Sequence, residues 1–332
     1  MMQPIIEDLD GEIQLDLRPK EAKPKVFVEE VVLRPELTLE QAEEKWRDKN
    51  SKRWLGQNLD KSIVKYRPEV STFYRTPDWH AKLLLLRGVL DADFYAKAYE
   101  RVRQIKYTPA ANSKRAALKG SPGGEALFGF NDQMQVIAHL RLRQKYPEWT
   151  APSVHQFPVF RGLWPICWNM EDLLREYMPT YWQGREIGDV HGPAPRGDLE
   201  ENEFFKYPEQ YRRLVRGWSD WGLFYSIPGS NFSTLTANWN TIFRAHKDAR
   251  NSSGALSCLA AFGTYRGGEL CFPRLGVAID ARERDLLICD CPRELHGTLP
   301  LLGTRYSVVA YTREGLTRMG TRHKHVVAVP PL

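Results

Sequence analysis

The second half of the chain is a series of short strand-like runs separated by turn residues, and no other feature constrains the fold as strongly. The runs are too short for helices and are rich in leucine, β-branched and aromatic residues. They lie at 221–227, 238–244, 255–263, 269–272, 275–280, 285–290, 294–298 and 306–312. So many short strands in about 90 residues predict two packed sheets, in a double-stranded β-helix of the jelly-roll or cupin-like type.

The first half has a different texture, in which helix-like segments predominate. Thr38 and Gln41 have the spacing of a capping box, so we expect a helix from there to about Lys52. Further helices are expected at about 91–105, 131–145, 168–178 and 203–216. Two long irregular segments, 106–127 and 183–202, are rich in glycine, proline and charge, as functional or disordered loops are. The predicted class is α+β, with a helical N-terminal half and a β-helix core.

Four regions are therefore predicted along the chain. Residues 1–35 form a flexible acidic arm, and 36–220 form a mainly helical region that packs on the core. Residues 221–320 form the double-stranded β-helix, and 321–332 form a basic tail.

Charge points to a polyanionic partner. The formal charge is +6, and the first 17 residues hold five acids and no Lys or Arg, which leaves +11 for the remainder. DNA and RNA are the commonest polyanions that a basic surface attracts. No stretch approaches the roughly 20 apolar residues of a membrane span, and the first residues lack the order of a secretory signal. We therefore expect an intracellular protein that makes no contact with a membrane.

The five cysteines show no Cys-x-x-Cys spacing, so neither a disulfide framework nor a zinc site is indicated. We expect reduced thiols, mostly in the core.

Two histidines and an aspartate form a candidate metal site. His246 and Asp248 follow the predicted strand 238–244, and His296 stands in the predicted strand 294–298. An extended backbone places residues i and i+2 on the same side, so the first two side chains can face one ion. Two imidazoles and one carboxylate on one face are the ligands of non-haem Fe(II) oxygenases. A His-x-Asp pair alone is more often an ordinary turn or surface pair. The neighbouring motifs therefore decide whether this pair marks a metal site.

Arg305 and Ser307 provide those surroundings, because they open the strand that follows His296. A dicarboxylic co-substrate that chelates iron at one end needs a cation at the other end. Arginine offers a bidentate fork for that carboxylate, and serine adds a hydroxyl. The alternative for Arg305 is an ion pair at a strand edge.

The joint order of these motifs resembles the Fe(II)/2-oxoglutarate-dependent dioxygenase superfamily, and more narrowly its TET/JBP-like branch, which oxidises the 5-methyl group of pyrimidines in DNA. Between the two histidines the order includes Gly267-Gly268-Glu269-Leu270 and Asp285-Leu286-Leu287. The resemblance covers roughly 221–315 and implies that Fe(II), 2-oxoglutarate and molecular oxygen are used. It implies that the metal ligands, which are also the catalytic residues, are His246, Asp248 and His296. It implies that the co-substrate is bound by Arg305, Ser307 and Asn240.

The resemblance also implies how the substrate is bound. Asn251, in the loop after His-x-Asp, would contact the target base, and Tyr311 would stack on it. Arg313 stands where the family often has a histidine, so which pyrimidine is read stays open, with 5-methylcytosine first and thymine next. Asn112 and Arg115 are similar to an Asn-Arg element that the branch uses near the base or the backbone. Because a methyl group inside a duplex cannot reach a buried iron, the base must flip out of the stack.

The product implied is a 5-hydroxymethyl base, with formyl and carboxyl products on repeated turnover, made wherever the DNA lies: in a nucleus, or in the host cytoplasm for a viral or bacterial protein. Two other functions fit the same sequence. One is a hydroxylase of a protein or small molecule, for which the basic surface is incidental. The other is a non-catalytic nucleic-acid-binding module, which is disfavoured because all three ligands and the arginine are present. Protein partners are not indicated.

Overall fold

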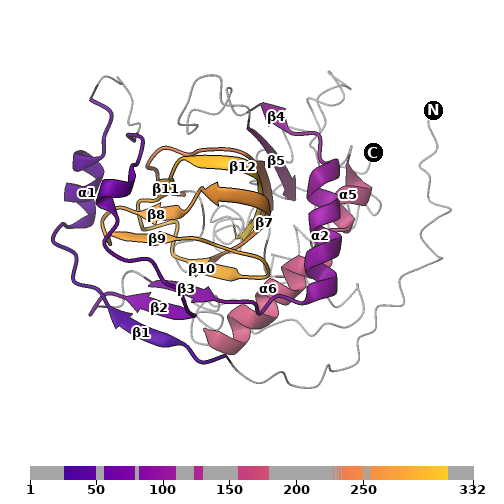
Figure 1. Ribbon diagram of the computed structural model, residues 1–332, viewed down its shortest axis with the longest axis horizontal. Helices are drawn as coiled ribbons and strands as arrows, with labels where there is room; N and C mark the ends of the chain where they lie inside the picture. Colours follow the sequence, from indigo (N-terminus) through magenta and orange to yellow (C-terminus); the bar gives the residue numbers. More distant parts are fainter. Residues whose placement is uncertain are drawn as a thin grey trace, which may run out of the picture.

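The computed structural model describes residues 26–49, 56–78, 82–109, 123–129, 156–178, 227, 230, 232, 234–249, 251 and 255–312. Within them a large sheet lies between a layer of helices on one side and a small sheet on the other (Figure 1). The strands are β1 (Glu29–Val32), β2 (Thr72–Arg75), β3 (Lys82–Leu86), β4 (Thr108–Pro109), β5 (Gly124–Gly129), β6 (Thr234–Trp239), β7 (Ser257–Gly267), β8 (Leu270–Phe272), β9 (Val277–Ile279), β10 (Leu286–Cys289), β11 (Gly297–Thr298) and β12 (Leu301–Tyr311). The helices are α1 (Leu39–Lys45), the short 3₁₀ helix η1 (Lys61–Ile63), α2 (Ala92–Gln104), α5 (Phe157–Arg161) and α6 (Trp164–Tyr177).

The large sheet has nine strands in the order β1-β2-β3-β10-β7-β12-β6-β5-β4, and the small sheet has the order β11-β8-β9. Neighbouring strands are antiparallel except β1 and β2, which are parallel. The longest pairing joins β7 and β12, from Leu301 opposite Gly267 to Ala310 opposite Cys258. It contains Gly263, whose φ of 106° is open to glycine and rarely to other residues, and a Cβ there would lie 2.2 Å from the carbonyl oxygen of Thr304.

Alternating side chains divide the apolar residues of the large sheet between two cores. On β3, Leu84 and Leu86 pack against the helices, whereas Leu83 and Leu85 pack against the small sheet. The same alternation on β12 turns Val308 toward the helices. The side chains on the other face of β12 border a cavity between the sheets, together with side chains of β5 and β6. The fold is therefore the α+β jelly roll that the sequence predicts.

Local capping explains where the helices begin. Thr38 and Gln41 form the predicted capping box at the start of α1, and the carboxylate of Asp91 accepts hydrogen bonds from two backbone N–H groups at the start of α2. The helix expected at 91–105 is confirmed as α2, and that expected at 168–178 lies within the longer α6. None of the helices in the described part of the chain has the length and apolar character that crossing a membrane requires.

The helix expected from Thr38 to about Lys52 is shorter, because α1 ends at Lys45. The helices expected at 131–145 and 203–216 lie outside the described residues. Most strands of the second half appear close to their predicted places, and 221–227 is described only at its last residue. The strand expected at 238–244 is displaced: β6 ends at Trp239, and Asn240 follows with a φ of 45°, which ends the extended conformation.

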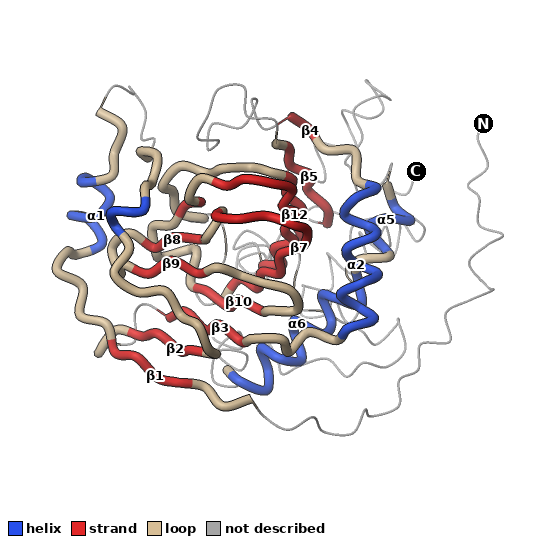
Figure 2. The backbone as a smooth tube through the Cα atoms, in the orientation of Figure 1, coloured by secondary structure: helices blue, strands red, loops and turns tan. Residues whose placement is uncertain are grey.

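The first half holds more strands than the sequence predicts (Figure 2). Residues 106–127, expected to be irregular, include β4 and β5, and the arm expected at 1–35 ends in β1. The central case is β3, a run of leucines that is buried on both faces. Because such a run has no polar alternation, periodicity cannot distinguish a buried strand from a buried helix. One sheet thus draws strands from three of the predicted regions, 1–35, 36–220 and 221–320.

Candidate active site

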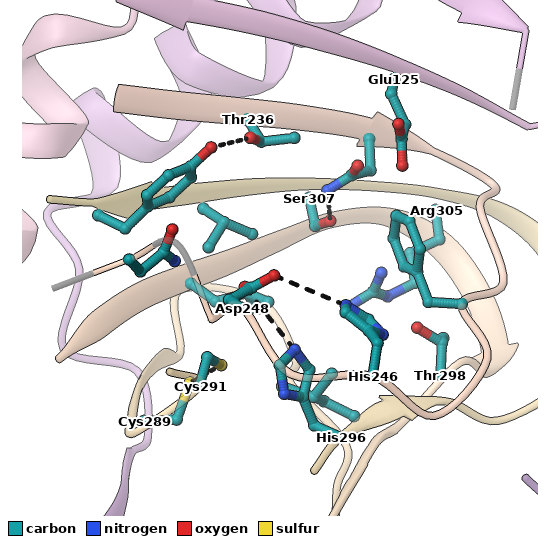
Figure 3. A pocket seen from close by; sticks show the side chains of 17 residues that line it. Glu125, Thr236, His246, Asp248, Cys289, Cys291, His296, Thr298, Arg305 and Ser307 are labelled. Atoms are coloured by element: carbon teal, nitrogen blue, oxygen red, sulfur yellow. Dashed lines mark hydrogen bonds and ion pairs between the residues drawn. The ribbon is translucent and has the colours of Figure 1, made fainter. Parts of the chain in front are cut away.

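Three ligating side chains meet at one end of the cavity between the sheets. Nε2 of His246 lies 3.8 Å from Oδ1 of Asp248, and Nε2 of His296 lies 3.8 Å from Oδ2 of the same carboxylate (Figure 3). The ligand atoms of all three residues lie within 4.8 Å of one another. A single ion at their centre can therefore be bound by two imidazoles and one carboxylate, the set that suits non-haem Fe(II).

Backbone carbonyls orient both imidazole rings. Nδ1 of His246 donates to the carbonyl oxygen of Arg244 at 2.7 Å, and Nδ1 of His296 donates to that of Glu294 at 2.9 Å. With the proton held on Nδ1, Nε2 carries the lone pair that binds a metal. Each histidine thus has the tautomer and the direction that a ligand needs.

The electrostatic environment of His296 favours a cation. Burial lowers the pKa of this imidazole, but Cys291 and the carboxylate of Asp248 outweigh burial and raise the pKa to about 9. The same carboxylate that stabilises a proton on Nε2 would stabilise a divalent ion in its place. The metal therefore competes with a proton for this nitrogen.

Arg305 borders the same cavity and is nearly buried, with 7% of its surface exposed. Its Nε has no hydrogen-bond partner, and no acid of the described residues forms an ion pair with it. Its guanidinium carbon lies 5.5 Å from the centre of the Tyr265 ring. A buried guanidinium without a counter-ion is unfavourable. Its place beside the metal ligands fits the far carboxylate of 2-oxoglutarate, which would supply the missing negative charge.

Ser307 stands on the same face of β12 and is held by a residue that the sequence analysis missed. Nδ2 of Asn238, on β6, donates to Oγ of Ser307 at 3.3 Å. The serine hydroxyl therefore accepts one hydrogen bond and keeps its own proton for a bound carboxylate. Oδ1 of Asn238 is buried without a hydrogen-bond partner and also borders the cavity. The sequence did contain a signal for Asn238. It stands two residues before Asn240, and alternate residues of a strand share a face.

The side chain of Asn240, which was expected to bind the co-substrate, bonds to the backbone of β12. Its Oδ1 accepts from the backbone N–H of Arg305 at 2.7 Å, and its Nδ2 donates to the carbonyl oxygen of Gly303 at 3.1 Å. Both side-chain groups are thus used by the backbone of β12, and Asn240 does not border the cavity. It stabilises the strand that carries Arg305.

The two expected base-contacting residues that the structure describes both border the cavity. Asn251 is buried, and its backbone N–H donates to the carbonyl oxygen of Asp248 at 2.8 Å. The hydroxyl group of Tyr311 lies 3.0 Å from Oγ1 of Thr236. Three other expected substrate contacts lie outside the described residues: Arg313, Asn112 and Arg115.

Cys289 and Cys291 form part of the cavity wall, with their sulfur atoms 3.2 Å apart. A hydrogen bond with Cys289 and burial hold the pKa of Cys291 well above its ordinary value. The metal-ligating group in this part of the structure is His246, Asp248 and His296, without either sulfur. The two cysteines therefore form part of the wall, with Cys289 at the end of β10 and Cys291 two residues beyond it.

Comparisons with known proteins place this geometry in a family. The model of the TET/JBP oxygenase domain of the 2-oxoglutarate/Fe(II) dioxygenase superfamily matches residues 153–314. No curated protein matches the chain. Among solved structures, the chain is similar to NgTET1 in complex with 5mC DNA, with 14% identity, a TM-score of 0.38, and 76% of this chain and 79% of that chain covered. It is also similar to OsALKBH1, with 10% identity and a TM-score of 0.38. This similarity covers 69% of this chain and 97% of that chain.

A third likeness is to the viral collagen prolyl hydroxylase of Paramecium Bursaria Chlorella virus-1 in its 2-oxoglutarate complex, with 14% identity, a TM-score of 0.21, and 24% of this chain and 57% of that chain covered. At such low scores these structural likenesses are distant. The family match, together with the metal-binding geometry, carries the assignment. Residues 153–314 therefore match the TET/JBP oxygenase domain of the Fe(II)/2-oxoglutarate-dependent dioxygenase superfamily, and the metal-binding geometry of the chain agrees with that match.

Proposed function

We propose that this dioxygenase oxidises the 5-methyl group of a pyrimidine in DNA to the 5-hydroxymethyl base and further products. 5-Methylcytosine is the first candidate substrate, and thymine is the second. One observation supports this most directly: Tyr311 and Asn251 border the same cavity as the three metal ligands. An aromatic ring and an amide are the groups that hold a base outside its stack. The basic body of the chain suits the phosphates that accompany such a base.

Each group at the site has a defined task. His246, Asp248 and His296 hold Fe(II), and Arg305 and Ser307 hold the far carboxylate of 2-oxoglutarate. When both are bound, they supply an oxidation in which oxygen converts 2-oxoglutarate to succinate and carbon dioxide and adds one oxygen atom to a C–H bond. The protein contributes position and a dry environment.

The walls of the cavity provide that dry environment. Leu259, Leu270 and Val309 border it, beside Cys289 and Cys291. Tyr311 would stack on the extruded base while Asn251 bonds its polar edge, so that the methyl group points toward the metal. Extruding the base costs a few kcal/mol, which stacking and edge contacts offset.

The experiment supplies the protein with Fe(II), 2-oxoglutarate and a duplex that contains 5-methylcytosine, and then analyses the digested nucleosides by mass spectrometry. The proposal expects 5-hydroxymethylcytosine from that strand and none from a duplex in which cytosine replaces the methylated base. 5-Hydroxymethyluracil in both duplexes would identify thymine as the target. Succinate without any altered base would instead favour hydroxylation of a protein or small molecule. No succinate and no altered base, with salt-dependent binding of the duplex, would favour a non-catalytic binding module.

A further inference from the structure

An N-terminal segment that lies outside the family-matched residues packs directly on the metal-binding loops. The segment comprises α1, its C-terminal end to Asp48, and residues 56–60. Figure 1 shows α1 beside the small sheet, on the side opposite α2 and α6. The family match begins only at residue 153, so nothing in that match assigns a role to this segment.

Two ion pairs join this segment to the chain on either side of His246. Lys247 pairs with Glu43 of α1, and Nη1 of Arg244 lies 3.1 Å from Oδ2 of Asp48. All four side chains are partly buried, with between 24% and 31% of each exposed. Such pairs are less screened by solvent than fully exposed ones.

Backbone contacts reinforce the ion pairs. The N–H group of Ala245 donates to the carbonyl oxygen of Gln57 at 2.9 Å, and the N–H group of Gln57 donates to that of Trp46 at 2.7 Å. Gly56 approaches so closely that a Cβ there would lie 1.7 Å from the carbonyl oxygen of Ala245. The segment is thus in direct contact with the residue that precedes the first metal ligand.

The same segment reaches the loop of the second histidine. Leu59 is buried, and a Cβ on Gly297 would lie 2.9 Å from its Cδ1 atom. Leu59 shares a hydrophobic cluster with Trp46, Ala245 and Leu295. Both ligand-bearing loops therefore pack on one N-terminal element.

A short chain of contacts links Asp48 to the metal-binding nitrogen. Asp48 holds the guanidinium of Arg244, and the carbonyl oxygen of Arg244 accepts the Nδ1 proton of His246 at 2.7 Å. That hydrogen bond sets both the tautomer and the direction of the imidazole. From this geometry we infer that Glu43 and Asp48 are positioning residues for the metal centre, and that the N-terminal segment completes the oxygenase site.

The test measures metal binding and needs no DNA, so it rests on the metal centre and is independent of the proposed substrate. Co(II), which does not react with oxygen as Fe(II) does, is titrated into the full chain and followed by its visible absorption. The variant E43Q/D48N removes both charges with little change in shape. We expect Co(II) binding to weaken about 3- to 10-fold, below the 10- to 100-fold range for groups bonded directly to a ligand. We also expect the visible band to shift, because the direction of His246 changes.

A matched control is E36Q, since Glu36 pairs with Lys65 at 3.0 Å in the same N-terminal region. The control should bind Co(II) as the parent protein does. A double-mutant cycle adds specificity: in a K247Q background, E43Q should weaken Co(II) binding no further, because its partner is already neutral. Thermal unfolding of every variant identifies any loss of folded protein. If E43Q/D48N lowers the unfolding temperature but keeps the parent's Co(II) affinity and spectrum, the segment is only a structural support and the inference is wrong.

Discussion

His246 and His296, fifty positions apart in the chain, exchange both of their backbone hydrogen bonds: the N–H of His246 donates to the carbonyl of His296 at 2.8 Å, and the reverse bond is 2.9 Å long. This closed pair brings the two imidazole centres to 4.4 Å. The spacing of the two ligands is thus set by the backbone and does not depend on the ion. A metal site built in this way should keep its shape when the ion is removed.

We therefore expect removal of the metal with a chelator to leave the far-ultraviolet circular dichroism spectrum almost unchanged. Returning Co(II) at a hundred times its dissociation constant should raise the free energy of unfolding by about 2.7 kcal/mol, because the ion binds only the folded state. Denaturant titration with and without Co(II) measures this difference. A large loss of secondary structure on chelation would show that the ion itself holds the two loops together.

Replacing the carboxylate ligand separates catalysis from DNA binding. In Asp248→Ala the metal keeps two imidazoles and loses its only anionic ligand, so turnover should fall below detection. DNA affinity should stay nearly unchanged, because phosphate contacts dominate it. Succinate formation and a duplex-binding titration measure the two quantities, with Asp280→Ala as an exposed control. Full activity in Asp248→Ala would contradict the proposed ligand set.

Arg305→Lys tests the co-substrate site. Lysine keeps the charge but loses the planar fork, so the KM for 2-oxoglutarate should rise while the rate at saturation changes less. A lost charge-assisted hydrogen bond of about 1.5 to 3 kcal/mol corresponds to an increase of roughly 10- to 150-fold. Steady-state kinetics at varied 2-oxoglutarate check this. Arg266→Lys, an exposed arginine on β7, should behave as the parent does; equal effects in both variants would reject the role of Arg305.

Asp290 makes stability depend on pH. Burial raises the pKa of its carboxyl to about 7, although Arg293 and Lys82 oppose this, and burial lowers the pKa of Lys82. The unfolded carboxyl titrates near 3.9, so the folded state binds the proton more tightly. Protonation of Asp290 therefore stabilises the folded state. This stabilisation is fully present below about pH 4, is lost as the pH rises to about 7, and stays lost above that.

Asp290→Asn removes this dependence, because a neutral amide replaces the protonated acid. Relative to the parent protein, the variant should gain stability as the pH rises from 5 to 8, by an amount on the order of a few kcal/mol. Urea unfolding at both pH values measures the gain. Asp280→Asn, at an exposed aspartate, should show no such trend. A difference between Asp290→Asn and parent that is constant across this range would contradict the burial effect.

All five cysteines should be slow to react in the folded protein. They are buried and form no disulfide, and burial raises the pKa of Cys271 to about 12. The thiolate is the reactive form, so a raised pKa and a covered sulfur both slow the attack. A colorimetric disulfide reagent at pH 8 should react slowly with the native protein. In denaturant, where the thiols are no longer covered, it should react with all five. Rapid reaction of the native protein would show that the cavity wall at Cys289 and Cys291 opens to solvent.

The linear chain determined the features that depend on spacing alone. The spacing of His246 and Asp248, two positions apart, predicted that both would face one ion, and the capping box at Thr38 marks the start of α1. Short runs broken by turn residues predicted the jelly roll. The order of the motifs likewise predicted that Arg305 would share a cavity with the metal ligands.

Only the tertiary structure decided which distant strands pair and which side chains finish the site. Nothing local in the leucine run of β3 indicates that it pairs with β10, about 200 positions later. The bond from Asn238 to Ser307, the use of Asn240 by the backbone of β12, and the contact of Glu43 with Lys247 likewise join separate segments. Periodicity and capping are properties of neighbouring residues. Contacts between segments depend on how whole elements pack, and no single window of sequence contains that information.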